Sequence, residues 1–160
     1  MEMKEYLCEI FLFNDEANRK MLKKIETLPV KQECIRYFSH LINSQVRWLA
    51  RIKEYPANPK LDWWMPVYIF EELDRRWSDS LHDWLQFLNS KTEEQISAEV
   101  NFIGFDGTHF AAQLKDIALQ LNYHSIHHRA QMQMIIRQQG IEPDFIDYIG
   151  TRYRKIDQHE

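Results

Sequence analysis

Long stretches in which apolar residues recur at steps of three and four dominate this sequence of 160 residues. Four such stretches run over residues 4–27, 30–53, 67–89 and 108–139, and this spacing is typical of helices with one buried face. The chain has only four glycines and five prolines, too few turn residues for a sandwich or barrel of many short strands. The sequence therefore predicts an all-α fold, a four-helix bundle.

The connections between the predicted helices differ in length. Leu28 and Pro29 separate the first two helices. Residues 55–66 contain three prolines and are predicted to form a loop. A long crossover joins helices three and four, with a short extended piece over residues 100–105 and a turn at Asp106 and Gly107.

Capping residues indicate where the last helices begin and end. Thr108 is predicted to cap the start of helix four, and Gly140 stands where a glycine commonly follows a helix end. Asp144, directly after Pro143, is predicted to cap a short C-terminal helix.

Length and charge narrow the class of protein. A length of 160 residues favours a single domain spanning residues 1–160. The net charge of −4 offers no basic face for nucleic acid. The chain contains no run of eighteen apolar residues, and its start lacks the pattern of a signal peptide, so we expect neither a membrane span nor export. Cys8 and Cys34 are interpreted as free thiols, which agrees with a cytoplasmic location.

Histidines cluster within the predicted fourth helix. In the stretch NYHSIHHRAQ (122–131), His124 and His128 fall on the apolar stripe and His127 falls beside it. Two histidines four residues apart lie one turn above each other, so their imidazoles can bind one metal ion. The alternative is a polar core cluster in which each ring hydrogen bonds to another group. His40 and His82 remain as candidates for a third ligand, and helical phase does not choose between them.

Three stretches resemble the DinB-like (DinB/YfiT) family of metal-binding four-helix bundles. They are FLFNDEANRKMLKKIETLP (11–29), YFSHLINSQVRWLARI (37–52) and NYHSIHHRAQMQMIIRQQGIEPDFIDYI (122–149). The resemblance implies that His40, His124 and His128 bind one divalent metal ion. It also implies a relation to thiol-dependent S-transferases and isomerases, and a homodimer. Ala130 stands where the family usually has glycine.

Three neutral imidazoles leave coordination positions open, as in catalytic metal sites. Zn²⁺ or Ni²⁺ is favoured, and Fe²⁺, Mn²⁺ and Co²⁺ also accept histidine. An open metal site leads us to expect a metal-dependent transferase or hydrolase that acts on a small molecule, and the family resemblance implies the thiol S-transferase type with a low-molecular-weight thiol. The alternative is a non-catalytic, stress-related protein in which the ion stabilises the bundle. Side chains placed to orient the ligands or meet a substrate are Asn43, Ser44, Gln131, Arg47 and Arg129, the last of which could instead pair with Asp147.

Overall fold

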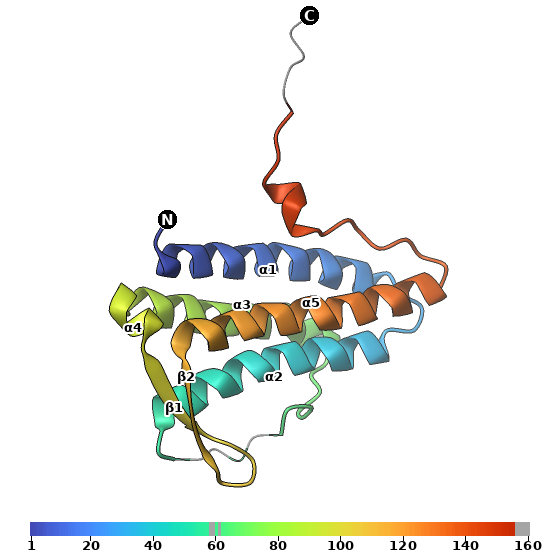
Figure 1. Ribbon diagram of the computed structural model, residues 1–160. Helices are drawn as coiled ribbons and strands as arrows, with labels where there is room; N and C mark the ends of the chain where they lie inside the picture. Colours follow the sequence, from blue (N-terminus) through green and yellow to red (C-terminus); the bar gives the residue numbers. More distant parts are fainter. Residues whose placement is uncertain (58–59, 61, 156–160) are drawn as a thin grey trace, which may run out of the picture.

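The chain is mostly helical. The structure, a computed structural model, describes residues 1–57, 60 and 62–155. Within that part, the long helices are α1 (Met3–Glu26), α2 (Gln32–Glu54), α3 (Phe70–Asn89) and α5 (Leu114–Gln138). The shorter elements are α4 (Glu93–Ser97), strands β1 (Glu99–Ile103) and β2 (His109–Gln113), and a 3-10 helix, η1 (Tyr148–Thr151). The long helices lie side by side, and the β1–β2 hairpin projects beyond them (Figure 1).

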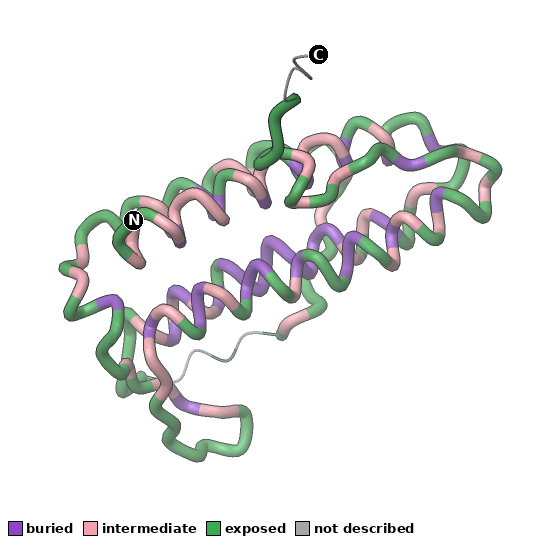
Figure 2. Tube along the Cα trace, turned by 45° about the horizontal axis from the view of Figure 1, so that its top comes forward, coloured by how far each residue is buried: buried purple, intermediate pink, exposed green. Residues whose placement is uncertain are grey.

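The long helices share one interior. Helices α1 and α2 each pack against both α3 and α5. The buried residues lie along the helix faces that look inward (Figure 2), which is the outcome that the periodic apolar stripes predict. None of the helices in the described part of the chain is long and apolar enough to span a membrane.

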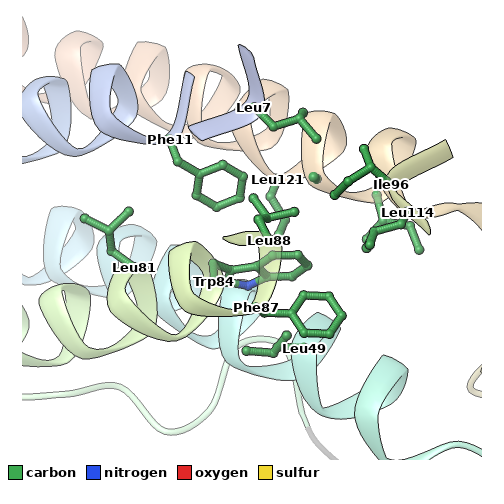
Figure 3. Packing of buried hydrophobic residues seen from close by; sticks show 12 residues of the cluster. Leu7, Phe11, Leu49, Leu81, Trp84, Phe87, Leu88, Ile96, Leu114 and Leu121 are labelled. Atoms are coloured by element: carbon green, nitrogen blue, oxygen red, sulfur yellow. The ribbon is translucent and has the colours of Figure 1, made fainter. Parts of the chain in front are cut away.

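Two apolar clusters fill the interior. One contains Phe11, Trp84 and Leu121 and is shown in Figure 3. The other contains Phe38 and Trp77 and lies toward the opposite ends of the same helices. Between the clusters lies a layer of buried polar side chains: Asn14, Asn18, His40, Asn43, Ser44, Gln45, Ser80, Asn122, Ser125, His128 and Arg129. This polar layer contains the side chains that are best suited to bind a ligand or take part in a reaction.

The start of the last long helix was predicted wrongly. Residues 109–113 form strand β2, which pairs antiparallel with β1, and α5 begins only at Leu114. Thr108 does not cap a helix, because its hydroxyl and backbone N–H donate to Asp106 within the turn. Phe110 pairs with Phe102 across the strands, with ring centroids 5.6 Å apart. Residues 109–113 find their backbone hydrogen-bond partners in β1, in place of the partners that an earlier helix start would have supplied.

Two other boundaries also differ from the predictions. Helix α3 begins at Phe70 rather than residue 67, because Tyr68 is drawn against α2, where its backbone N–H donates to Ser39 Oγ. The C-terminal helix is a 3-10 turn preceded by Asp147, whereas Asp144 forms an ion pair with Lys24 at 3.2 Å. The other ends agree well: α1 and α2 start and stop within a few residues of the predicted bounds.

Some further predictions are confirmed. Gly140 follows the end of α5 with φ of 74°, as a glycine after a helix should. The extended piece in the crossover is strand β1. The loop after α2 is non-helical over its described residues, and residues 58, 59 and 61 of it lie outside the described part.

Candidate metal centre

Three imidazoles meet between α2 and α5. His40 comes from α2, and His124 and His128 come from consecutive turns of α5. The Nε2 atom of His124 lies 3.0 Å from Nε2 of His40 and 3.0 Å from Nε2 of His128. One ligand nitrogen from each of the three lies within 4.8 Å of the others. His40 and His128 are buried, and His124 is half-buried. Residues 84 apart in sequence thus meet at a single point.

Their outer hydrogen bonds decide which nitrogen carries the proton. His40 Nδ1 lies 2.7 Å from the carbonyl oxygen of Trp63, and His128 Nδ1 lies 2.5 Å from Oε1 of Gln131. A carbonyl oxygen only accepts, so each Nδ1 donates and each Nε2 keeps a lone pair. Both lone pairs point at Nε2 of His124, whose single proton can satisfy only one of them. The cluster therefore has an excess of lone pairs directed at one place.

Burial keeps the three rings neutral. It lowers the pKa of His124 to about 4, and the nearby His128 and His40 act in the same direction. It also lowers the pKa of His128 to about 4, against the opposing effect of the Gln131 hydrogen bond. The pKa of His40 is lowered by burial and by the positive charges of Arg47 and Arg36. Neutral imidazole is the form that binds a metal ion.

The donor set fits a divalent ion. Nitrogens about 2.1 Å from a metal lie about 3.0–3.4 Å apart at octahedral or tetrahedral angles. The two separations from His124 Nε2, both 3.0 Å, are at the short end of this range, and all three ligand nitrogens lie within 4.8 Å of one another. Convergent lone pairs repel each other unless a proton or a cation lies between them. A metal ion removes the conflict at all three rings together.

A pocket of about 210 Å³ opens beside the histidines. Its walls are His40, Ser44, Trp48, Trp63, Gln120, Leu121 and His124. The pocket reaches two of the three candidate ligands, so a small molecule in it would contact the position that a metal ion would take. Such access distinguishes a reactive site from a closed structural site.

Aromatic side chains from the α2–α3 connection close one side of the cluster. The Trp64 ring stacks on His40 with centroids 3.8 Å apart and planes 7° from parallel. Tyr37 packs against the His128 ring at 5.3 Å. The Trp63 ring lines the pocket, and the guanidinium of Arg51 lies 4.7 Å from its centroid. The rings of His40 and His128 are thereby held in one orientation.

The three side chains predicted to orient the ligands do different things. Gln131 bonds directly to the His128 ring. The Ser44 hydroxyl donates to the backbone oxygen of His40 and lines the pocket. Asn43 bonds to the Pro66 oxygen and to the Tyr68 hydroxyl, so it holds the connection rather than a ligand ring.

The two arginines also differ from their predicted roles. Arg47 is buried and donates to the backbone oxygen of Met65, so it holds the connection, and it is absent from the pocket wall. Arg129 bonds to the neutral side chains of Asn14, Asn18 and Ser125. Its predicted pairing with Asp147 is absent from the ion pairs of the described residues.

Sequence reasoning missed the contribution of the backbone at Trp63 and the stacking of Trp64. The Trp-Trp pair in a proline-rich loop was a signal, but its meaning depends on where the loop lies. Among the described histidines outside the cluster, His82, His109 and His127 are exposed, and His159 lies outside the described residues. His127 is therefore a flanking residue, as the helical phase predicted.

Comparison with known protein families finds a match that covers the candidate metal centre. A family model described as the DinB superfamily matches residues 29–132, which contain all three histidines of the cluster. The search of curated proteins finds no match.

Proposed function

The chain belongs to the DinB superfamily, and we propose on this premise that His40, His124 and His128 bind one divalent metal ion. The observation that carries the proposal is the meeting of three Nε2 atoms, with Nδ1 of His40 and His128 committed to carbonyl acceptors. We also interpret the arrangement of α1, α2, α3 and α5 as the four-helix bundle of this superfamily, with the crossover running through α4, β1 and β2.

The histidine-only donor set suits Zn²⁺ or Ni²⁺ first, and Fe²⁺, Mn²⁺ or Co²⁺ after them. Carboxylate-rich sites, by contrast, are typical of Mg²⁺ and Ca²⁺. Each of the three rings supplies one neutral nitrogen, so the bound ion keeps its full positive charge. That charge makes it an effective Lewis acid.

For the activity, we propose a metal-dependent transferase of the thiol S-transferase type, or a hydrolase, that acts on a small molecule in the cytoplasm. The metal ion would polarise a carbonyl or lower the pKa of a bound water or thiol. The pocket walls supply the rest. Trp48, Trp63 and Leu121 exclude water from an apolar group, and Ser44 and Gln120 offer hydrogen bonds. A second copy of the chain is the expected partner, in a homodimer; the net charge of −4 gives no support for nucleic acid.

A non-catalytic role is the second candidate. The ligands come from α2 and α5, so a bound ion cross-links two helices 84 residues apart in sequence. Such a link stabilises the folded chain by a free energy that grows with the logarithm of the metal affinity. In this case the protein would be a stress-related metalloprotein whose ion stabilises the fold.

Metal analysis of protein purified without a histidine tag tests the metal proposal. We expect about one equivalent of metal after repletion; less than about a tenth of an equivalent would rule out both roles. Substitution with Co²⁺ then tests the activity class, because a thiol that binds the ion adds a sulfur-to-cobalt charge-transfer band. The band should appear on titration with glutathione or cysteine. If neither thiol changes the Co²⁺ spectrum and metal removal causes a large fall in melting temperature, the stabilising role is favoured.

A further inference from the structure

A second pocket, of about 150 Å³, lies between α1 and α5. It is separate from the histidine cluster, which lies between α2 and α5. Its walls are mostly apolar and aromatic, with Ile10 and Phe13 from α1, Ile126 from α5, and Tyr148 from η1. Three buried polar side chains, Asn14, Asn122 and Arg129, also line it.

Arg129 has no counterion in this pocket. Its side chain belongs to a residue that is 3% exposed, and its hydrogen bonds to Asn14, Asn18 and Ser125 all come from Nη1. Its Nε and Nη2 atoms donate to no described residue, and the ion pairs of the described residues do not include it. An arginine guanidinium stays charged at neutral pH. A buried charge without an opposite charge is costly.

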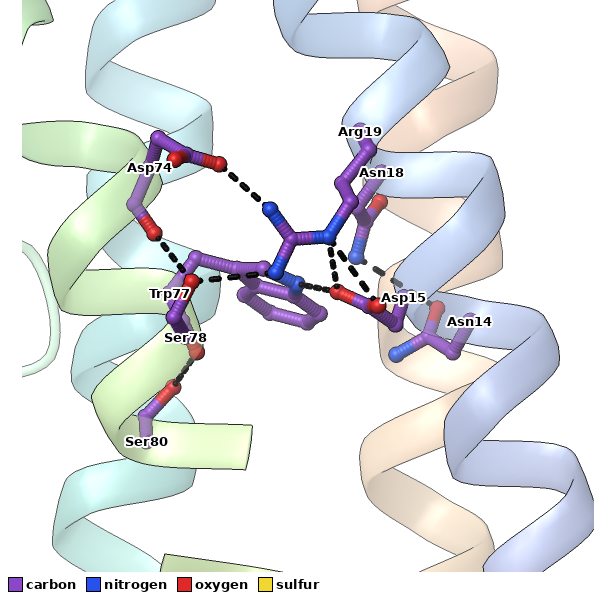
Figure 4. Close-up of polar contacts among 8 residues, drawn as sticks. All are labelled: Asn14, Asp15, Asn18, Arg19, Asp74, Trp77, Ser78 and Ser80. Carbon is purple, nitrogen blue, oxygen red and sulfur yellow. Dashed lines mark hydrogen bonds and ion pairs between the residues drawn. The ribbon is translucent and has the colours of Figure 1, made fainter. Parts of the chain in front are cut away.

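A neighbouring arginine shows what a balanced site looks like in the same helices. Arg19, which is much more exposed, forms ion pairs with Asp15 at 3.0 Å and Asp74 at 2.6 Å (Figure 4). The exposed arginine therefore has two carboxylates, and the buried one has none. The difference is the reverse of what solvation alone would favour.

Two further polar atoms at the same pocket lack partners. Asn14 accepts through Oδ1, and its Nδ2 is buried without an acceptor. Asn122 donates through Nδ2 to the backbone oxygen of Ala118, and its Oδ1 is buried without a donor. Buried polar groups are normally satisfied. The two amide atoms have almost no accessible surface, so among these three side chains only Arg129 offers unused donors to a ligand in the pocket.

We propose that the pocket between α1 and α5 binds a small organic carboxylate with an apolar body. The carboxylate accepts from Arg129, and the body contacts Phe13, Ile126 and the rim tyrosines. The volume is suitable, because an apolar cavity of about 150 Å³ holds a benzene ring. The proposal does not depend on the function of the metal centre.

Titration of the metal-loaded protein with 4-fluorobenzoate, followed by ¹⁹F NMR, tests this proposal. We expect saturable binding with a Kd of about 1 mM or tighter. The neutral analogue 4-fluorobenzamide should bind at least about tenfold more weakly, because a hydrogen-bonded charge is lost. Binding must persist in His124→Ala, which excludes coordination of benzoate at the metal centre.

Substitutions on α5 identify the pocket. Ile126 is 48% exposed at the pocket wall, so Ile126→Glu should fold, and its negative charge should weaken benzoate binding about fivefold or more. Met134→Glu adds the same charge to the same helix at a residue that is 60% exposed and outside the pocket wall, and it should change nothing. Arg129→Lys keeps the charge and loses the planar fork, so it should bind more weakly than the natural chain. Absence of saturation, equal binding of the benzamide, or equal effects of the two glutamates would overturn the proposal.

Discussion

Helix α5 buries polar side chains both on the face that meets α2 and on the face that meets α1. The partner missing from one face is opposite in charge to the partner missing from the other. Toward α2, imidazole lone pairs converge with too few protons among them. Toward α1, Arg129 presents N–H donors and a positive charge with no anion. We propose that a cation completes the first set and an anion the second, so that one helix would supply two sites of opposite sign within the same polar layer.

On both faces, neutral hydrogen-bond partners determine whether the site can bind a positive or a negative ligand. On the histidine face, carbonyl oxygens from Trp63 and Gln131 take the Nδ1 protons and so free the Nε2 lone pairs. On the arginine face, amide and hydroxyl oxygens hold one guanidinium nitrogen without cancelling its charge. A carboxylate beside Arg129 would neutralise the guanidinium charge internally. Its absence leaves that charge available to a ligand.

Of the predicted effects, the loss of metal affinity on removal of one imidazole should be the largest. His124 stands between the other two rings, so His124→Ala should lower metal affinity by more than about a hundredfold, because three ligands become two. Competition with a chromophoric chelator measures the affinity. His127→Ala is the matched control, since His127 is the adjacent exposed histidine, and its affinity should be unchanged. Equal losses in the two variants would show that the metal binds elsewhere.

Removing the partner of a ligand ring should have a smaller effect. Gln131→Leu deletes the acceptor of the His128 Nδ1 proton, so metal affinity should fall about tenfold. Gln138→Leu, at an exposed position near the end of α5, is the control. The same chelator competition compares the two variants. If Gln131→Leu bound metal as tightly as Gln138→Leu, the assignment of the His128 tautomer would be wrong.

Of the two faces, only the histidine face should make the metal-free protein less stable as the pH falls. The pKa of His124 and His128 is about 4 in the folded chain and about 6.5 in the unfolded chain. As the pH falls below about 6.5, the unfolded chain takes up protons that the folded chain does not, so the free energy of unfolding decreases until about pH 4. Arg129 stays protonated throughout this window. Urea unfolding at several pH values measures the slope.

A double variant supplies the control for the acid effect. The double variant H124N/H128Q removes two of the three imidazoles whose pKa is lowered in the folded chain. Its metal-free unfolding should depend less on pH across the same window. A slope as steep as that of the natural metal-free chain would assign the acid sensitivity to other groups.

Much of the metal centre could be predicted, because it depends on local spacing. The i, i+4 relation of His124 and His128 and the position of Gln131 one turn from His128 follow from helix geometry. His40 was different. Every residue of α2 from Phe38 to Gln45 is buried, because the α2–α3 connection covers the side that the other helices do not. An apolar stripe cannot reveal the phase of a helix buried on both sides, so only the family resemblance selected His40.

The missed features depend on contacts between distant segments. Residues 109–113 continue the apolar spacing of α5, and only their pairing with β1 makes them a strand. The Trp63 oxygen that orients His40 is a backbone atom, so no residue type marks it. The lack of a counterion at Arg129 is also invisible in the sequence, which offers Asp147, after the end of α5, as a plausible partner. These features required the fold.

The smallest predicted effects come from two aromatic substitutions, one at the histidine cluster and one at the Arg129 pocket. Trp64→Leu removes the ring stacked on His40 and should weaken metal binding about two- to fivefold, the effect of one aromatic contact. Phe13→Leu removes a ring from the other pocket, where it lies 6.0 Å from the Arg129 guanidinium, and should weaken binding of 4-fluorobenzoate by a similar factor. Each variant should leave the other ligand's affinity unchanged. Because α5 is common to both faces, an effect of either variant on both affinities would show that the helix couples the sites, and they could no longer be treated as independent.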